Sequence, residues 1–274
     1  MLTNKMGLPE TIIRALNNDK YSKGKRADFS VTQIIAPAYQ AKLKRENEWS
    51  EDAADRIFAL LGQATHSILE RAAEGLEGVI SERRFYKRIM GKVLSGQIDL
   101  LENGVLSDFK VTSTYKRETS PEWTAQLNML KLLAQRKGRE IHTLQIIAIY
   151  RDWSATQAER SAEYPQAQVG IIPVPMWDKQ QTVDYIKARL AEHISANPTP
   201  CTDEERWARP GVYAVMKEGR KSAVALYDTL EEANASAENH GTSSGHHVVA
   251  RPKVYTRCEK YCPVAHACPL MVKP

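Results

Sequence analysis

Apolar residues recur every three or four positions in three stretches of the chain, and this period predicts amphipathic helices. The stretches are residues 52–73, 122–136 and 179–194. In the first stretch, Gly62, His66 and Glu70 form a second stripe beside the apolar one, because residues four apart lie above one another on a helix. The pattern therefore puts a histidine and a carboxylate on one helical face.

Residues 93–111 have the composition of two β-strands joined at Asn103 and Gly104. Asn-Gly between apolar strands predicts a type I′ hairpin, since both central residues of that turn need a positive φ. With this turn in place, Asp99 faces Asp108 across the ladder, and their β-carbons are about 5 Å apart. The hairpin thus brings two carboxylates to one face.

Like charges that face each other destabilise a sheet and call for a cation. Lys110 points to the same face as Asp108, and a hard divalent ion such as Mg²⁺ or Mn²⁺ prefers carboxylate oxygens. Such an ion activates water and neutralises phosphoryl oxygens, so the cluster suits phosphodiester hydrolysis. The alternative interpretation is a solvated hairpin with Asp99, Asp108 and Lys110 at its surface.

The remaining pattern completes an α/β prediction, with a mixed central sheet flanked by helices and a small C-terminal ββαβ unit. A buried strand is expected at 144–150, and the C-terminal unit at 212–216, 223–227, 230–238 and 247–250. We expect a loosely ordered basic arm at 1–29, a core at 30–200 and a cysteine-bearing module at 201–274.

Composition excludes several classes of protein. Of the 274 residues, 42% are hydrophobic and 26% are charged, which is typical of a globular chain. Apolar runs do not exceed five residues, so no membrane span is expected. The segment 1–26 has no apolar core of a signal peptide, which predicts a cytoplasmic location. The net charge of +5 is compatible with a nucleic-acid partner.

The four cysteines are unevenly placed: Cys201 is alone, while Cys258, Cys262 and Cys268 lie close to the C-terminus. In a reducing compartment such residues are thiols or metal ligands. Four thiolates suit tetrahedral zinc or a [4Fe-4S] cluster. Three histidines are weaker candidates as zinc ligands: His246, His247 and His266.

Several motifs resemble those of the PD-(D/E)XK nuclease superfamily. Gly96-x-x-Asp99 and Asp108-Phe109-Lys110 are similar to its Gly-x-x-Asp and Asp-x-Lys signature. Gly62-x-x-x-His66 resembles the upstream motif of its RecB-like branch, and Gln126 matches the glutamine of Gln-x-x-x-Tyr, with Leu130 in place of the tyrosine. The resemblance covers about residues 30–151 and implies a restriction-endonuclease-like core.

The resemblance also implies roles for individual residues. His66, Asp99, Asp108 and the carbonyl of Phe109 are expected to hold the Mg²⁺ or Mn²⁺ ion. Asp99, Asp108, Lys110 and Gln126 are the expected catalytic residues. Glu70 is a candidate to orient the His66 imidazole. Glu82 is a further acidic candidate, interpreted instead as a solvated charge at a helix end.

The cysteine pattern resembles the iron-sulfur clasp of AddB and of the four-cysteine CRISPR adaptation nucleases. This favours a structural [4Fe-4S] cluster on Cys201, Cys258, Cys262 and Cys268, with Zn²⁺ as the alternative.

The expected function is a metal-dependent DNA exonuclease of phage or prophage recombination or DNA end processing. Basic clusters at 20–26, 42–45, 83–88 and 116–117 are candidates to contact the phosphate backbone. No base-reading motif is present, so cutting is expected to be sequence-independent, and a single-strand annealing or recombination protein is a candidate partner. The alternative is a non-catalytic DNA-binding or recombination accessory protein with a structural four-cysteine metal site.

Overall fold

The structure is a computed structural model, and it describes residues 1–18, 24, 26–135, 139–240 and 245–271. The chain divides into two compact units, described in turn. Unit 1 comprises residues 1–41 and 49–198, and unit 2 comprises residues 42–48 and 199–274. Unit 1 holds the hairpin with both aspartates, and unit 2 holds all four cysteines.

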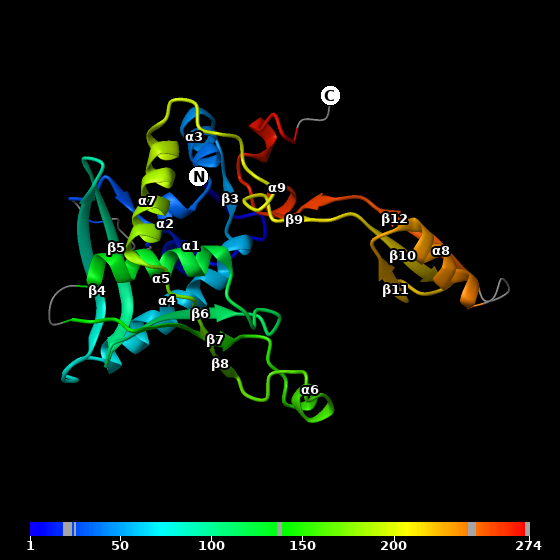
Figure 1. The fold of residues 1–274 in the computed structure, drawn as a ribbon, viewed down its shortest axis with the longest axis horizontal. Helices are drawn as coiled ribbons and strands as arrows, with labels where there is room; N and C mark the ends of the chain where they lie inside the picture. Colours follow the sequence, from blue (N-terminus) through cyan, green and yellow to red (C-terminus); the bar gives the residue numbers. More distant parts are fainter. Residues whose placement is uncertain (19–23, 25, 136–138, 241–244, 272–274) are drawn as a thin grey trace. The chain divides into compact units, whose positions relative to one another are not determined.

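Unit 1 is built on a six-stranded mixed sheet in which the strands follow the order β2-β5-β6-β7-β8, with β4 paired to β5 (Figure 1). The β2–β5 and β6–β7 pairs are parallel, and the β4–β5, β5–β6 and β7–β8 pairs are antiparallel. The expected α/β class with a mixed sheet is confirmed. The strands are β2 (Phe29–Ser30), β4 (Ile80–Ile89), β5 (Lys92–Glu102), β6 (Val105–Thr112), β7 (Thr143–Tyr150) and β8 (Val169–Pro173).

The β5–β6 hairpin has the predicted turn. Asn103 and Gly104 have φ values of 47° and 76°, the left-handed region that a type I′ turn requires. The first pairs beyond the turn include Leu100 with Ser107, which is the register expected from the sequence. The turn residues therefore fix which side chains of β5 and β6 come together.

Helices flank this sheet, and the three predicted from the apolar period are confirmed as α4, α5 and α7. The N-cap Ser120 accepts a hydrogen bond from the N–H of Trp123, and Pro121 stands at the first helical position of α5, where its missing N–H has no partner to lose. The helices of unit 1 are α1 (Glu10–Asn17), α2 (Val31–Ile35), α4 (Ile57–Ala72), α5 (Pro121–Ala134), α6 (Ala155–Arg160) and α7 (Lys179–Ile194). Helix α3 (Ala38–Glu46) has residues in both units.

The core lies where α2, α5 and α7 pack together and α5 packs on the sheet. Fully buried members include Ile98, Leu127 and Ile186. Gly96 of β5 lies directly under α5, and a β-carbon at this position would overlap Cδ2 of Leu130. A glycine here lets the strand approach the helix closely.

Helix α4 is amphipathic as predicted, but its apolar stripe is not buried. The side chains of Phe58 and Ile68 are 57% and 56% exposed. The other stripe carries His66 and faces β6, with the His66 ring edge-on to Phe109. The face that the helix turns toward the sheet is thus the one that bears its polar residues.

The N-terminal segment differs from the loosely ordered arm expected at 1–29. Strand β1 (Leu2–Thr3) pairs with β3 (Glu51–Asp52), and α1 contacts α4. Leu16 of α1 is 1% exposed, and this burial holds the helix on unit 1. Of the basic residues in this arm, Lys20, Lys23 and Lys25 lie outside the described residues.

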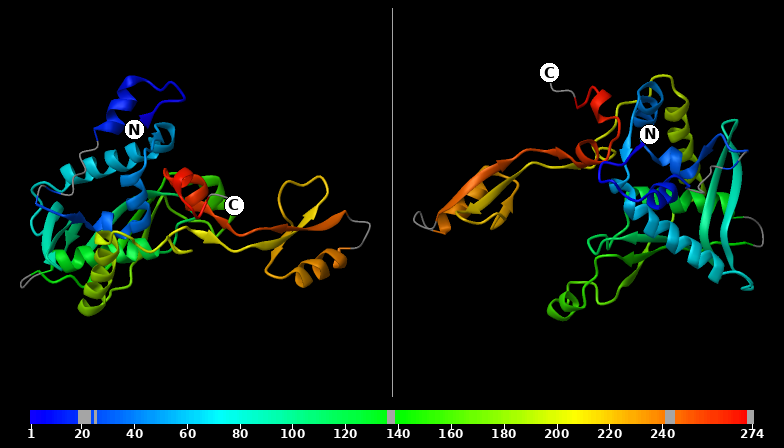
Figure 2. Two further views of the ribbon diagram at one scale, coloured as in Figure 1. Left: turned by 90° about the horizontal axis from the view of Figure 1, so that it is seen from above. Right: turned by 180° about the vertical axis from the view of Figure 1, so that it is seen from behind.

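Unit 2 contains the predicted ββαβ arrangement. Its three-stranded antiparallel sheet has the order β11-β10-β12, and α8 packs on this sheet (Figure 2). A short β9–β13 pair leads into α9, which carries Cys258. The elements are β9 (Ala208–Arg209), β10 (Val212–Lys217), β11 (Ala225–Tyr227), α8 (Leu230–Asn239), β12 (His246–Arg251), β13 (Val254–Tyr255) and α9 (Thr256–Lys260).

Candidate functional site

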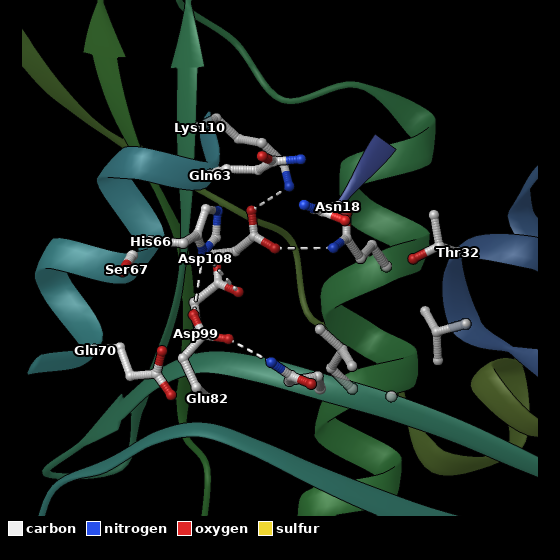
Figure 3. Close-up of a pocket in the computed structure, with 15 residues that line it drawn as sticks. Asn18, Thr32, Gln63, His66, Ser67, Glu70, Glu82, Asp99, Asp108 and Lys110 are labelled. Carbon is white, nitrogen blue, oxygen red and sulfur yellow. Dashed lines mark hydrogen bonds and ion pairs between the residues drawn. The ribbon is translucent and has the colours of Figure 1, made fainter. Parts of the chain in front are cut away.

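A pocket of about 490 Å³ opens at the edge of β5, between its pairing with β2 at Ser95 and its pairing with β6 at Leu100 (Figure 3). The β5–β6 pairs end one residue short of Asp99 and Asp108. Oδ2 of Asp99 instead accepts the backbone N–H of Phe109 at 2.8 Å. The predicted direct pairing of the two aspartates is therefore wrong in detail, because a side chain takes the place of the ladder bond, yet both carboxylates line this pocket.

Asp108 is held from two elements. The side-chain amide of Gln126 on α5 donates to its Oδ1 at 2.9 Å, and the ammonium of Lys110 lies 2.6 Å from its Oδ2. Asp108 is 1% exposed, and its Oδ2 makes no hydrogen bond of good geometry within the described part of the chain. This oxygen thus has a lone pair that a cation can use. Asp108, Lys110 and Gln126, three of the expected catalytic residues, thus lie together, and their catalytic roles stay predictions.

A second group in the same pocket consists of His66, Asp99 and Glu82. Nδ1 of His66 lies 3.1 Å from Oε1 of Glu82 and 3.6 Å from Oδ1 of Asp99. One ligand atom from each of the three residues lies within 4.8 Å of the other two. The described residues thus include one compact set of an imidazole and two carboxylates.

Glu82 is not the solvated helix-end charge expected from the sequence. It belongs to β4, stands opposite Asp99, and has a φ of 46°, which is unusual for a residue with a side chain. The β4–β5 pairs lie on both sides of this position and omit it. The left-handed backbone bends Glu82 out of the ladder and toward His66. Neither a hydrophobic period nor a turn motif in the sequence predicts this left-handed residue within β4.

The Glu82 carboxylate is fixed by a chain of side chains. The amide of Gln97 donates to its Oε2, and the guanidinium of Arg84 donates to the Gln97 carbonyl at 2.8 Å and to Ser95 Oγ at 3.3 Å. Each of these bonds joins a residue of β4 to a residue of β5. The second carboxylate of the group is therefore oriented by the sheet itself.

Glu70 lies on the rim of the same pocket, as expected from its place on α4. The carboxylate that contacts His66 Nδ1, however, belongs to Glu82. The role of orienting the imidazole therefore passes from Glu70 to Glu82, because the left-handed turn in β4 brings the latter within bonding distance.

The carboxylates and cations of the pocket shift one another's pKa values. Burial, and after it the charge of Asp108, raises the pKa of Asp99, which is about 8 although His66 and Lys110 act in the opposite direction. The hydrogen bond to Glu82 raises the pKa of His66 despite burial. Burial lowers the pKa of Lys110, but the charges of Asp108 and Asp99 outweigh it, so the net pKa is raised. Burial and the neighbouring Asp108 thus both oppose ionisation of Asp99.

The donor set fits a hard divalent cation. Carboxylate oxygens with an imidazole nitrogen are ligands that Mg²⁺ and Mn²⁺ accept. Asp108 Oδ2 contacts the Lys110 ammonium with one lone pair and has a second one for a metal ion. His66, Asp99 and Asp108 are brought to one pocket as expected. Phe109 is placed beside Asp99 through its N–H, and its carbonyl as a ligand stays a prediction.

The four cysteines lie in unit 2, and none of them forms a disulfide bond with another described cysteine. Burial raises the pKa of Cys268, and Cys262 and Cys258 raise it further, so these three thiols are electrostatic neighbours. The guanidinium of Arg206 forms a hydrogen bond with Cys258, which together with that thiol's charge raises the pKa of Arg206 despite burial.

Among the described residues, the thiols show no arrangement like that of a bound metal ion or cluster. Bonds of 2.3 Å to one zinc ion would put the sulfur atoms about 3.8 Å apart. Among the residues that the structure describes, no three thiols have their sulfur atoms within 4.8 Å of one another. The four irons of a cluster each bind one thiolate and hold the ligands farther apart than a single ion does. Cys201 and the identity of any group on these thiols stay predictions.

Comparison with known proteins adds little. No protein-family model and no curated protein matches this chain. Eight chains of solved structures match it, and among them the crystal structure of SSO0001 has 18% sequence identity and a TM-score of 0.45, covering 72% of this chain and 89% of that one. A likeness at this level assigns no family. None of the described helices is long and apolar enough to cross a membrane.

Proposed function

We propose that this chain is a metal-dependent DNA nuclease with a restriction-endonuclease-like core. The observation that carries the proposal is the arrangement of Asp108, Lys110 and Gln126 in one pocket with His66 and Asp99. Its motifs occur in the order of the RecB-like nucleases, and its acidic residues sit where two strands of a hairpin part.

In this proposal His66, Asp99, Asp108 and the Phe109 carbonyl hold a Mg²⁺ or Mn²⁺ ion. When bound, the ion supplies a water of lowered pKa and neutralises charge on the phosphoryl oxygens. The side chain of Gln126 holds Asp108 in place through its 2.9 Å bond, and Glu82 orients His66. The chain itself then supplies ligands that need little rearrangement.

Lys110 acts as a cation rather than as a base. Its pKa is raised above the ordinary lysine value by Asp108 and Asp99, so the ammonium keeps its proton near neutral pH. A fixed ammonium can donate to the attacking water or stabilise the charge that develops on the phosphate. It therefore serves positioning and electrostatic stabilisation, and no covalent nucleophile is needed.

We further propose a [4Fe-4S] cluster with a structural role on Cys201, Cys258, Cys262 and Cys268, with Zn²⁺ as the alternative. The neighbouring thiols of the C-terminal triplet and the cationic Arg206 beside Cys258 support it, since several thiolates need positive charge nearby. The physiological role would be exonucleolytic processing of DNA ends in phage or prophage recombination.

The test uses end-labelled linear DNA and circular DNA, incubated with the purified protein and Mg²⁺ or Mn²⁺. We expect cleavage that needs the ion, fails in Lys110→Ala and Asp108→Ala, and persists in Lys179→Ala, which removes an exposed lysine of α7. DNA binding, followed with EDTA present, should persist in all three variants. Undiminished cutting by Lys110→Ala and Asp108→Ala would reject the proposal, and binding without any cutting by the unmodified protein would favour the accessory protein.

A further inference from the structure

One side of β4 continues the pocket as a row of cationic and aromatic residues. Side chains alternate along a strand, so Arg84, Tyr86 and Arg88 share a side of β4. We call these three residues the β4 row. Arg84 donates to Gln97, which lines the pocket, so the row is on the pocket side of the strand.

The other side of β4 faces the core. Phe85 packs against the core cluster, and Ile89 is 8% exposed within it. Arg83 and Lys87 belong to this second side by the same alternation. One strand thus carries cations on both of its sides, Arg84 and Arg88 on the pocket side and Arg83 and Lys87 on the other.

The β4 row is open to solvent away from the pocket. Tyr86 is 45% exposed and Arg88 is exposed, whereas Arg84 is half-buried through its bonds to Gln97 and Ser95. Arg88 is six residue steps along the strand from Glu82, which corresponds to about 20 Å. The row therefore leads from the carboxylates to the surface over the length of several nucleotides.

Gly24 of the N-terminal segment lies close to the row at Tyr86. A β-carbon on Gly24 would overlap the Tyr86 hydroxyl and lie 3.0 Å from Cδ of Arg84, so the backbone of Gly24 passes close to both side chains. Arg26, two residues on, is exposed. The nearby carboxylate of Asp28 is engaged by the N–H of Val93 at 2.7 Å. A bond from a neutral N–H leaves the charge of Asp28 in place, so the positive charge offered to a phosphate is that of the row itself.

We propose that the nucleic-acid strand entering the pocket lies along the β4 row as a single strand, with a phosphate on Arg88 and an unpaired base stacked on Tyr86. This inference rests on the proposed nuclease function and names its substrate class. A cation on the row binds phosphate without reading sequence, and an exposed aromatic ring stacks only on a base that is out of the duplex. Arg84 ties this strand to the pocket through Gln97 and Glu82.

The experiment measures the affinity of a fluorescein-labelled single-stranded oligodeoxynucleotide and of a blunt duplex by anisotropy, with EDTA present so that nothing is cut. We expect Tyr86→Ala to weaken single-strand binding about tenfold and Tyr86→Phe to retain it, since the stacking surface is kept. Arg88→Ala should weaken binding and reduce the slope of log affinity against log salt by about 0.7. Duplex binding should change less than single-strand binding.

The matched controls are Arg83→Ala and Lys87→Ala, which remove the same charge from the same strand on its other side. We expect both to bind the single strand as the unmodified protein does, with thermal unfolding confirming that all variants are folded. Normal affinity in Tyr86→Ala and Arg88→Ala, or an equal loss in the controls, overturns the inference. Cleavage by the unmodified protein is measured separately. A failure of the β4-row inference can therefore be told apart from a failure of the proposed nuclease function.

Discussion

Nδ1 of His66 lies 3.1 Å from Oε1 of Glu82, although the two residues come from a helix and from the distorted part of an edge strand. The contact raises the pKa of His66 and holds its ring beside Asp99. A ring fixed in this way presents its other nitrogen in a constant direction, as metal-binding histidines usually do. Glu82 is therefore as much a part of the site as the residues that the motifs single out.

Glu82→Gln tests this relationship. Removing the charge should lower the pKa of His66 toward its ordinary value and weaken Mn²⁺ binding about 10- to 100-fold. Titration of the His66 ring by NMR without metal, and calorimetry with Mn²⁺, measure the two effects. The matched variant is Glu70→Gln, which removes a carboxylate from the rim of the same pocket and should change neither. A shift in Glu70→Gln alone would contradict the assignment.

The metal-free protein should lose stability as the pH rises. The folded-state pKa of Asp99 is about 8, against about 4 in the unfolded chain, so the folded state binds the extra proton in this range. The stabilising contribution is complete below about pH 4 and is lost as the pH approaches 8. The raised pKa of His66 acts in the same direction above its unfolded value.

Urea unfolding in EDTA, at about pH 5 and about pH 8, measures this loss, for which each unit of pKa difference corresponds to ~1.4 kcal/mol. Mg²⁺ or Mn²⁺ should restore stability at the higher pH, because the positive charge of the ion replaces that of the proton lost from Asp99. Asp99→Asn should show a smaller dependence. A metal-free protein that is more stable at pH 8 than at pH 5 would contradict the raised pKa of Asp99 as the cause.

The parts of the site that depend on turn chemistry and helical periodicity can be predicted from the sequence. Asn103 and Gly104 determine the turn, and the turn determines that Asp99 and Asp108 come close. The helical stripe puts His66 on the side of α4 that meets β6. These features follow from periods and turn chemistry within a few residues, which is why a single sequence carries them.

Other parts depend on contacts between distant segments. Strand β4 has no clear alternation of apolar and polar residues, and the left-handed φ of Glu82 has no sequence signal. The burial of Leu16, which fixes α1 to unit 1, likewise depends on tertiary packing of a segment that reads as polar. The geometry of the cysteines is decided by long loops and by whatever group they bind, so their spacing alone cannot place them.

Gln126→Ala should destabilise the protein through Asp108. The amide donates to a carboxylate that is 1% exposed, and its loss leaves a buried acceptor without that donor. We expect the free energy of unfolding to fall by about 1–3 kcal/mol in denaturant titrations without metal, with a smaller fall when Mn²⁺ is present. Gln135→Ala, an exposed glutamine at the end of the same helix, is the control. Equal stability of both variants would show that the bond to Asp108 contributes nothing.

The cysteine group predicts a metal content that serine variants reveal. Anaerobically purified protein should contain about four irons per chain and absorb visible light, which a zinc site with its filled d shell does not. Cys262→Ser should lose the iron and destabilise unit 2 while the pocket of unit 1 keeps its Mn²⁺ affinity. Stoichiometric zinc in place of iron would establish the alternative, and absence of both metals would contradict any metal role for these thiols.

Two glycines of the motifs should respond to alanine in opposite ways. At Gly96 a β-carbon would overlap Leu130, so Gly96→Ala should lower the free energy of unfolding by about 1–3 kcal/mol through overpacking. At Gly62, in the middle of α4, a β-carbon meets nothing, so Gly62→Ala should raise it by about 0.5–1 kcal/mol through helix propensity. The double variant Gly96→Ala/Leu130→Ala should lose less unfolding free energy than the two single variants do together, because truncating Leu130 makes room for the new methyl group. Strict additivity in urea unfolding would show that the close approach of β5 to α5 does not explain the glycine of Gly-x-x-Asp.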